Sequence, residues 1–152
     1  MRAFVLLTLV AAAVTAAPRL LPEYPARFDA SAANLRASLA KLNAAPTREA
    51  LDSARLAVQD LRRLVDAYFH APNLRDEKVR PIALALRPRL QRLLSGPEAL
   101  FVVHSDLVRL RPEVHRALAR ACAALSDDPC HREHTASAAA IEAETQGKAT
   151  RR

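Results

Sequence analysis

Apolar residues recur along this chain at alternating spacings of three and four, the period of an amphipathic helix that buries one face. A first helix is expected over residues 30–43, with Asp29 as its N-cap, and a second over 47–69. Charges of alternating sign flank the second apolar stripe, which indicates a solvated face paired within the helix. That stripe consists of Leu51, Ala54, Val58, Leu61, Val65 and Tyr68.

The same pattern continues in the second half of the chain, over residues 74–94 and again over 98–125. Ser95 and Glu98 have the spacing of a capping box, in which each side chain bonds the backbone amide of the other residue. This spacing predicts that the fourth helix starts there. The pattern then stops at Ser126-Asp127-Asp128-Pro129.

Proline interrupts the last two apolar segments. Pro81 is expected to begin a helix, because its missing amide does no harm in a first turn. Pro88 is expected to kink the third helix, and Pro112 to kink or divide the fourth. Four stripes with short connections predict an all-α fold, an up-and-down four-helix bundle with Pro-kinked third and fourth helices.

The two ends of the chain lack this pattern. Residues 1–16 combine a positive start with an apolar run too short to span a bilayer, which is typical of a cleavable signal peptide. Residues 17–28 are rich in proline and predict an extended leader before a helical bundle over 29–134. Residues 135–152 predict a flexible tail, with a short helix over residues 137–144 as the alternative. The expected location is extracytoplasmic, which means periplasmic in a Gram-negative bacterium and secreted otherwise.

The formal charge of +7 favours acidic partners. Arg80, Arg87, Arg89 and Arg92 are candidate anion-binding residues, and a solvated basic face is the alternative. The chain has no Trp and 4% aromatic residues, so there is little surface on which bases could stack. We expect a protein or an anionic component of the envelope or extracellular space as partner, with no nucleic acid and no transmembrane span. The oligomeric state stays open.

Cys122 and Cys130 are the two cysteines of the chain, and an even number in an exported protein predicts a disulfide. The alternative is a metal site, because cysteine and histidine side chains are ligands for zinc and copper. The candidate metal ligands are His131, His134 and His115, close in sequence to the cysteines. Their spacing matches no established zinc-finger pattern.

We find no catalytic motif. The serines lie in ordinary helix or cap positions, and most carboxylates have arginine neighbours that favour their ionised form. The sequence therefore predicts no catalytic residue, no cofactor and a non-enzymatic protein that binds a protein or anionic partner. A small extracytoplasmic metal-binding protein is the alternative.

The run from Leu35 to Pro72 resembles the helical domains of the imelysin family and the N-terminal extensions of some periplasmic dihaem peroxidases. The shared features are Leu42-Asn43-Ala44-Ala45-Pro46, Ala54-Arg55 and Tyr68-Phe69-His70-Ala71-Pro72. The resemblance implies an exported helical bundle linked to iron handling. The His/Glu metal motif of that family has no counterpart here, because Leu64 and Val65 stand where acidic character is expected. No site residue is therefore carried over.

Overall fold

The computed structural model describes residues 19–104 and 107–149. The predicted signal peptide lies outside these residues. The described part is mostly helical, with five helices and one β-hairpin. The elements are α1 (Tyr24–Ala44), α2 (Arg48–His70), α3 (Arg80–Leu94), β1 (Phe101–His104), β2 (Leu107–Leu110), α4 (Pro112–Ala124) and α5 (Asp128–Ala149). An all-α class is therefore broadly supported, whereas the four-helix bundle is not confirmed.

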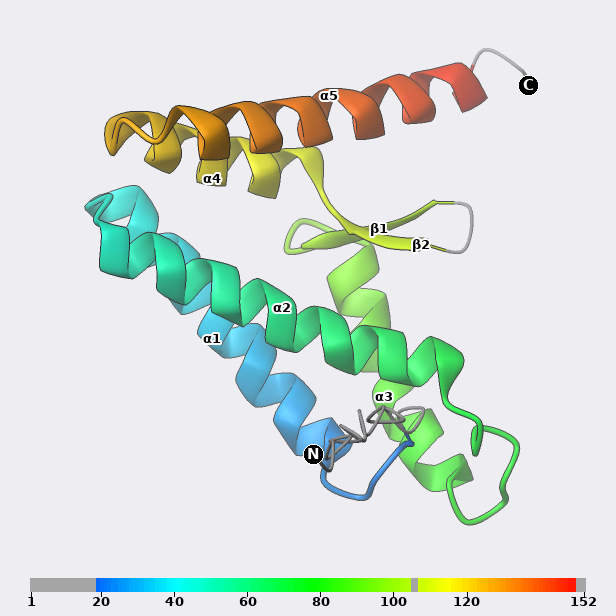
Figure 1. The fold of residues 1–152 in the computed structure, drawn as a ribbon. Helices are drawn as coiled ribbons and strands as arrows, with labels where there is room; N and C mark the ends of the chain where they lie inside the picture. Colours follow the sequence, from blue (N-terminus) through cyan, green and yellow to red (C-terminus); the bar gives the residue numbers. More distant parts are fainter. Residues whose placement is uncertain (1–18, 105–106, 150–152) are drawn as a thin grey trace, which may run out of the picture.

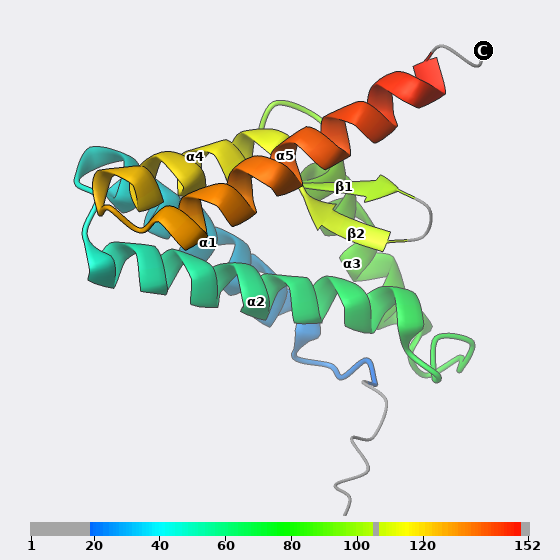
Figure 2. The same ribbon diagram turned by 45° about the horizontal axis from the view of Figure 1, so that its top comes forward.

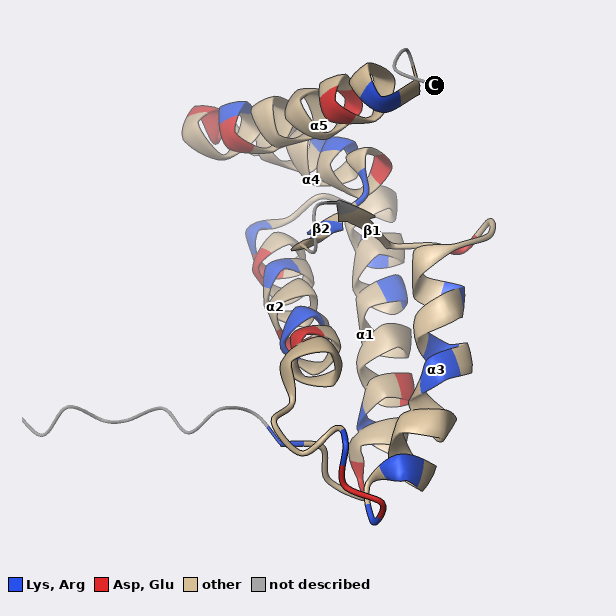
Figure 3. Ribbon diagram, turned by 90° about the vertical axis from the view of Figure 1, so that its right-hand side faces the viewer, with Lys and Arg blue, Asp and Glu red and all other residues tan. Residues whose placement is uncertain are grey.

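The helices form two packed groups (Figure 1). In the first group α1 lies between α2 and α3, as Figure 3 shows from the side. In the second group α4 and α5 form an antiparallel pair that lies across one end of the first group. The hairpin of β1 and β2 connects the two groups. Among the described helices, none combines the length and the apolar character needed to cross a bilayer.

Helix α1 starts earlier than the sequence predicts. It begins at Tyr24 rather than after Asp29, with proline in its first turn, so residues 24–28 of the predicted leader 17–28 are helical. Proline suits this place because its fixed φ is helical and the first turn needs no amide donor. The earlier start brings Phe28, which is 2% exposed, into the hydrophobic core.

Helix α2 confirms the predicted second helix to within one residue at each end. Thr47 is its N-cap, and its Oγ1 accepts a hydrogen bond of 3.1 Å from the Ala50 amide. The buried face is wider than the predicted stripe, because α2 contacts α1 on one side and α4 and β2 on the other. The buried residues are Leu51, Ala54, Ala57, Leu61, Leu64, Val65 and Ala67.

Helix α3 begins at Arg80, with Pro81 in its first turn as expected, and it continues through Pro88. The predicted capping box at its end is wrong. Ser95 is the C-cap of α3, and its Oγ donates 2.8 Å to the Gln91 carbonyl. Gly96 follows with a φ of 91°, a left-handed conformation that glycine adopts without strain. This glycine turns the chain away from the helix axis.

The first half of the predicted fourth helix is instead a β-hairpin. β1 and β2 pair antiparallel, with Phe101 opposite Leu110 and Val103 opposite Val108. Valine is stiff at χ1 and packs well on a pleated surface, which favours a strand here. Pro112 then begins α4, where its missing amide has no cost, so it divides the predicted helix rather than bending it.

The structure also differs from the predicted tail 135–152, because α5 runs from Asp128 to Ala149. Alanine has the highest helix propensity, and this segment is rich in it. One face of α5 is buried, at Cys130, His134, Ala138 and Ile141. The second half of α5 runs past α4 beside the hairpin (Figure 2). Ion pairs join it there to Arg109 through Glu144 and to Arg116 through Glu142.

Candidate functional site

A short turn joins α4 to α5 and brings two sulfur atoms together. Ser126 takes a φ of 55°, which reverses the chain, and the Asp127 amide donates 2.9 Å to the Cys122 carbonyl. Asp127 then caps α5, since its Oδ1 accepts a 3.2 Å hydrogen bond from the Cys130 amide. The Cα atoms of Cys122 and Cys130 are 5.7 Å apart and the side chains form the predicted disulfide.

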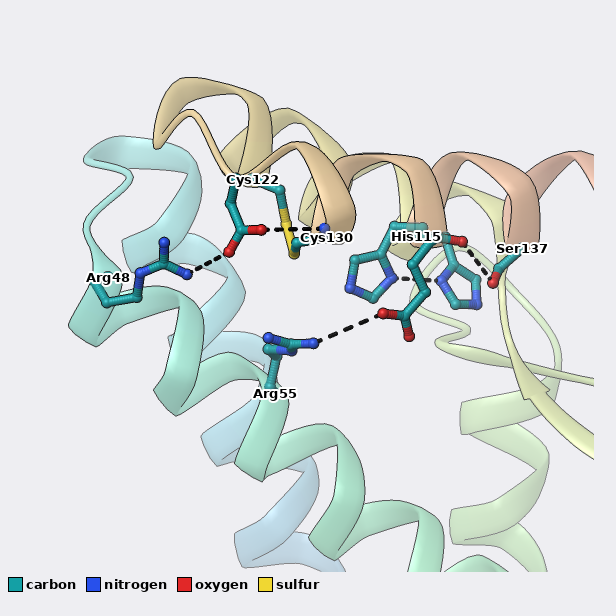
Figure 4. A network of polar contacts seen from close by, with 9 residues as sticks. Arg48, Arg55, His115, Cys122, Cys130 and Ser137 are labelled. Carbon is teal, nitrogen blue, oxygen red and sulfur yellow. Dashed lines mark hydrogen bonds and ion pairs between the residues drawn. A yellow bond between two sulfur atoms is a disulfide. The ribbon is translucent and has the colours of Figure 1, made fainter.

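The same turn is fastened to α2 by an ion pair. The Arg48 guanidinium donates 2.6 Å to Oδ2 of Asp127 (Figure 4). That hydrogen bond, together with the one from the Cys130 amide, lowers the pKa of the Asp127 carboxyl below its ordinary value. The Asp127 carboxylate in turn raises the pKa of Arg48. Asp127 therefore connects three helices: it caps α5, bonds the end of α4 and pairs with α2.

Two imidazoles meet between α4 and α5, near the disulfide. The Nδ1 atoms of His115 and His134 are 3.0 Å apart. His134 is 7% exposed, and its Nε2 is buried without a hydrogen-bond partner. A buried ring nitrogen without a partner costs about 1–3 kcal/mol, so it is a place where a ligand would be stabilising. His131 points elsewhere, since its Nδ1 lies 3.0 Å from the Ala119 carbonyl.

Both imidazoles of this pair are easier to keep neutral than a free histidine. Burial lowers the pKa of His115, the neighbouring His134 lowers it further, and the Glu133 carboxylate opposes both. Burial is also the main reason that the pKa of His134 is lowered, with Arg55 adding to it and Glu133 opposing it. A neutral imidazole is the form that binds metal ions.

Acid is expected to destabilise the disulfide-bonded protein through His115 and His134. Their pKa is lowered from 6.5 in the folded chain only, so below that pH the unfolded chain binds more protons. The two histidines therefore make their full contribution to the free energy of unfolding above about pH 6.5. This contribution decreases as the pH falls toward their lowered pKa. Urea denaturation between about pH 7 and about pH 5 measures this loss. Equal stability across that range would contradict the expectation, and His115→Gln with His134→Gln should flatten it.

The donor atoms of Cys122, Cys130 and His134 form one compact group. Each residue offers one atom, all three residues are buried, and these atoms lie within 4.8 Å of one another. The predicted metal ligands are therefore only partly brought together: His134 joins the cysteines, His115 holds its ring, and His131 bonds Ala119 instead. In the sequence, the spacing of Cys130 and His134 indicates that these two residues lie close together, because residues four apart share a helix face.

The predicted anion-binding arginines lie on α3, where they are the blue segments of that helix in Figure 3. Arg80, Arg87 and Arg92 are exposed. Arg89 is not available in the same way, because its guanidinium pairs with Asp29 at 2.9 Å and donates to the Ala85 carbonyl. Three of the four residues thus present their charge to solvent.

The resemblance to imelysin helical domains concerns a different part of the molecule. Its Leu42–Pro46 and Tyr68–Pro72 motifs lie at the ends of α1 and α2, whereas the sulfur and imidazole groups lie between α4 and α5. That resemblance stays a prediction from the sequence. Comparison with known protein families, with curated proteins and with solved structures finds no match for this chain.

Proposed function

We propose that this protein is an exported, non-enzymatic helical protein that binds a transition-metal ion between α4 and α5. The ligands are an imidazole nitrogen of His134 and the thiolates that Cys122 and Cys130 form once their disulfide is reduced. The observation that carries the proposal is the group of three buried donor atoms within 4.8 Å, supplied by two helices.

The arrangement around His134 supports this function. A metal-binding histidine usually gives its other ring nitrogen to a hydrogen-bond partner, which fixes its tautomer and orientation. Here Nδ1 of His134 meets Nδ1 of His115 at 3.0 Å, and Nε2 is the atom left without a partner. We therefore assign Nε2 as the ligand and His115 as the residue that holds the ring.

The chemistry of the donors favours zinc or cuprous copper. Thiolate and imidazole are the ligands that these ions prefer. With Zn–S bonds of about 2.3 Å at tetrahedral angles, the two sulfurs would lie about 3.8 Å apart, so they must separate from their bonded positions when the disulfide is reduced. Three protein ligands leave a fourth position open, an arrangement typical of sites that exchange a ligand.

Titration of the reduced full-length chain with Co²⁺, followed by Zn²⁺, tests this function. We expect thiolate-to-cobalt charge-transfer absorption that saturates at one ion per chain, because the three donors make one site. Zinc should then abolish the absorption. His134→Ala should lose the saturable signal, whereas His131→Ala on the same helix should keep it, because His131 already bonds the Ala119 carbonyl. Absence of saturable binding in the reduced wild type would refute the proposal.

The exposed arginines of α3 favour a second candidate function, binding of a polyanionic partner. Three guanidinium groups on one helix of a basic protein would concentrate anionic groups at that surface. Retention on a heparin column at physiological salt tests it, and flow-through of the wild type removes it. Glutamine at Arg80, Arg87 and Arg92 should shorten retention more than an equal loss of charge elsewhere. The matched control carries glutamine at Arg63, Arg120 and Arg132, which are exposed on other helices.

A further inference from the structure

We propose that Cys122 and Cys130 form a switch in which a disulfide and a bound metal ion exclude each other, and that a dithiol sets which of the two is present. This inference rests on the metal-binding function proposed above. Both states use the same two sulfurs: they are bonded to each other in this structure, and they are also two of the three donors in the compact group. A sulfur held in a disulfide is no thiolate ligand.

The exchange is a two-electron reaction. One thiolate of the dithiol attacks a sulfur of the Cys122–Cys130 bond; this bond breaks, one cysteine leaves as a thiolate and the other forms a mixed disulfide with the dithiol. The second thiol of the dithiol then attacks the mixed disulfide and releases the second cysteine. The protein gains two electrons and two protons, and the dithiol becomes a disulfide. Metal binding then releases the two thiol protons. In the reverse direction a disulfide oxidant removes two electrons, the Cys122–Cys130 bond forms again and the metal ion leaves.

The position of Cys130 favours the metal-binding form once the bond is broken. Cys130 is the third residue of α5, after the Asp127 cap and Asp128. The amide groups of a helix amino terminus interact favourably with nearby negative charge, which includes the charge of a metal-bound thiolate at this position. The unpartnered Nε2 of His134 acts in the same direction, because a metal ion would satisfy it and the disulfide does not.

Access to the disulfide is controlled by the first turn of α5. Cys122 is 0% and Cys130 is 4% exposed, so a dithiol can reach the sulfurs only when this turn opens. Asp127 holds the turn closed through its bond to the Cys130 amide, and Arg48 holds Asp127 from α2. We assign Arg48 as a positioning residue, a latch that slows the exchange without touching either sulfur.

Zinc release from the reduced, zinc-loaded chain during oxidation by oxidised glutathione tests the switch. We expect one zinc ion to appear, by a chromophoric zinc indicator, for every two protein thiols lost, and we expect the oxidised chain to bind no zinc. Release of zinc without loss of thiols would overturn the switch, as would retention of zinc by the oxidised chain. If the reduced chain takes up no zinc, the metal-binding function fails as well, so the two failures are distinguishable.

The latch has its own test. Arg48→Ala is expected to raise the rate of disulfide reduction by dithiothreitol about two- to fivefold, the range that loss of an exposed ion pair allows. Arg62→Ala is the matched control. Arg62 also lies on α2, but its ion pair is with Asp66 of the same helix rather than with the α5 turn. Thiol release followed with a chromogenic disulfide gives both rates. Equal rates in the two variants would overturn the assignment of Arg48.

Discussion

Leu61→Ala is expected to lower the free energy of unfolding by about 2–5 kcal/mol, because it leaves a cavity in the hydrophobic core. Leu61 is 0% exposed and belongs to the buried face of α2, which contacts α1, α4 and the hairpin. Its neighbours in an interior of this density cannot move far enough to fill the lost volume. Urea denaturation of the disulfide-bonded chain measures the change, at a pH above 6.5, where the lowered pKa of His115 and His134 favours their neutral forms.

Leu56→Ala is the matched control for this experiment. It removes the same atoms from the same helix, but Leu56 is 61% exposed, so the change should stay within about 0.5 kcal/mol. Similar losses in the two variants would mean that α2 does not bury the face described here. The comparison also removes helix propensity from the result, because leucine and alanine are exchanged in both cases.

The helices that the sequence predicts best are those whose local signals agree with one another. In α2 an unbroken apolar period, the Thr47 cap and the proline after Ala45 all indicate the same boundaries, and the structure places the helix there. The start of α1 was missed because Asp29 has the chemistry of a cap, while the proline in the first turn was the better signal. Where local signals compete in this way, tertiary packing determines at which residue the helix begins.

The hairpin shows why spacing alone was insufficient. Leu100, Val103, Leu107 and Leu110 are three or four apart, yet only Leu100 and Leu110 of these four are buried. Phe101 and Val108, which complete the buried face, do not belong to the helical stripe. The valines and the proline at the start of α4 carried the information that a strand pair precedes a new helix.

The full extent of helix α5 was missed for a different reason. Its buried face consists of a cysteine, a histidine, an alanine and one isoleucine, and such a face has almost no apolar period. Ion pairs also join its second half to Arg109 and Arg116, which lie before Pro112 and within α4. Contacts between residues that are distant in sequence leave no local pattern, so the propensity of alanine was the available signal.

The candidate site was predictable only in part for the same reason. The disulfide followed from the even number of cysteines and the predicted signal peptide, both of which can be read from the sequence. Which histidine joins the cysteines depends on how α4 and α5 rotate against each other, and this places His115 rather than His131 beside His134. The sequence supplied the correct residue types but could not specify this rotation.

Replacement of both cysteines, Cys122→Ala with Cys130→Ala, is expected to lower the free energy of unfolding by about 2–3 kcal/mol relative to the oxidised wild type. The disulfide closes a short loop, since the cysteines are 8 residues apart, and its loss returns chain entropy to the unfolded state. Urea denaturation with and without a reductant measures this contribution. The reduced wild type should match the variant, because each lacks the covalent link.

Zinc extends the same measurement to the proposed function. A ligand that binds the folded chain alone stabilises it by an amount that grows with its concentration. Zinc should therefore raise the urea concentration at the unfolding midpoint of the reduced wild type and leave that of the double alanine variant unchanged. If zinc stabilises neither protein, the two sulfurs serve only to close the α4–α5 turn. If it stabilises both equally, the metal binds away from them. Stabilisation of the reduced wild type alone would link the geometry of the turn to a metal-binding function.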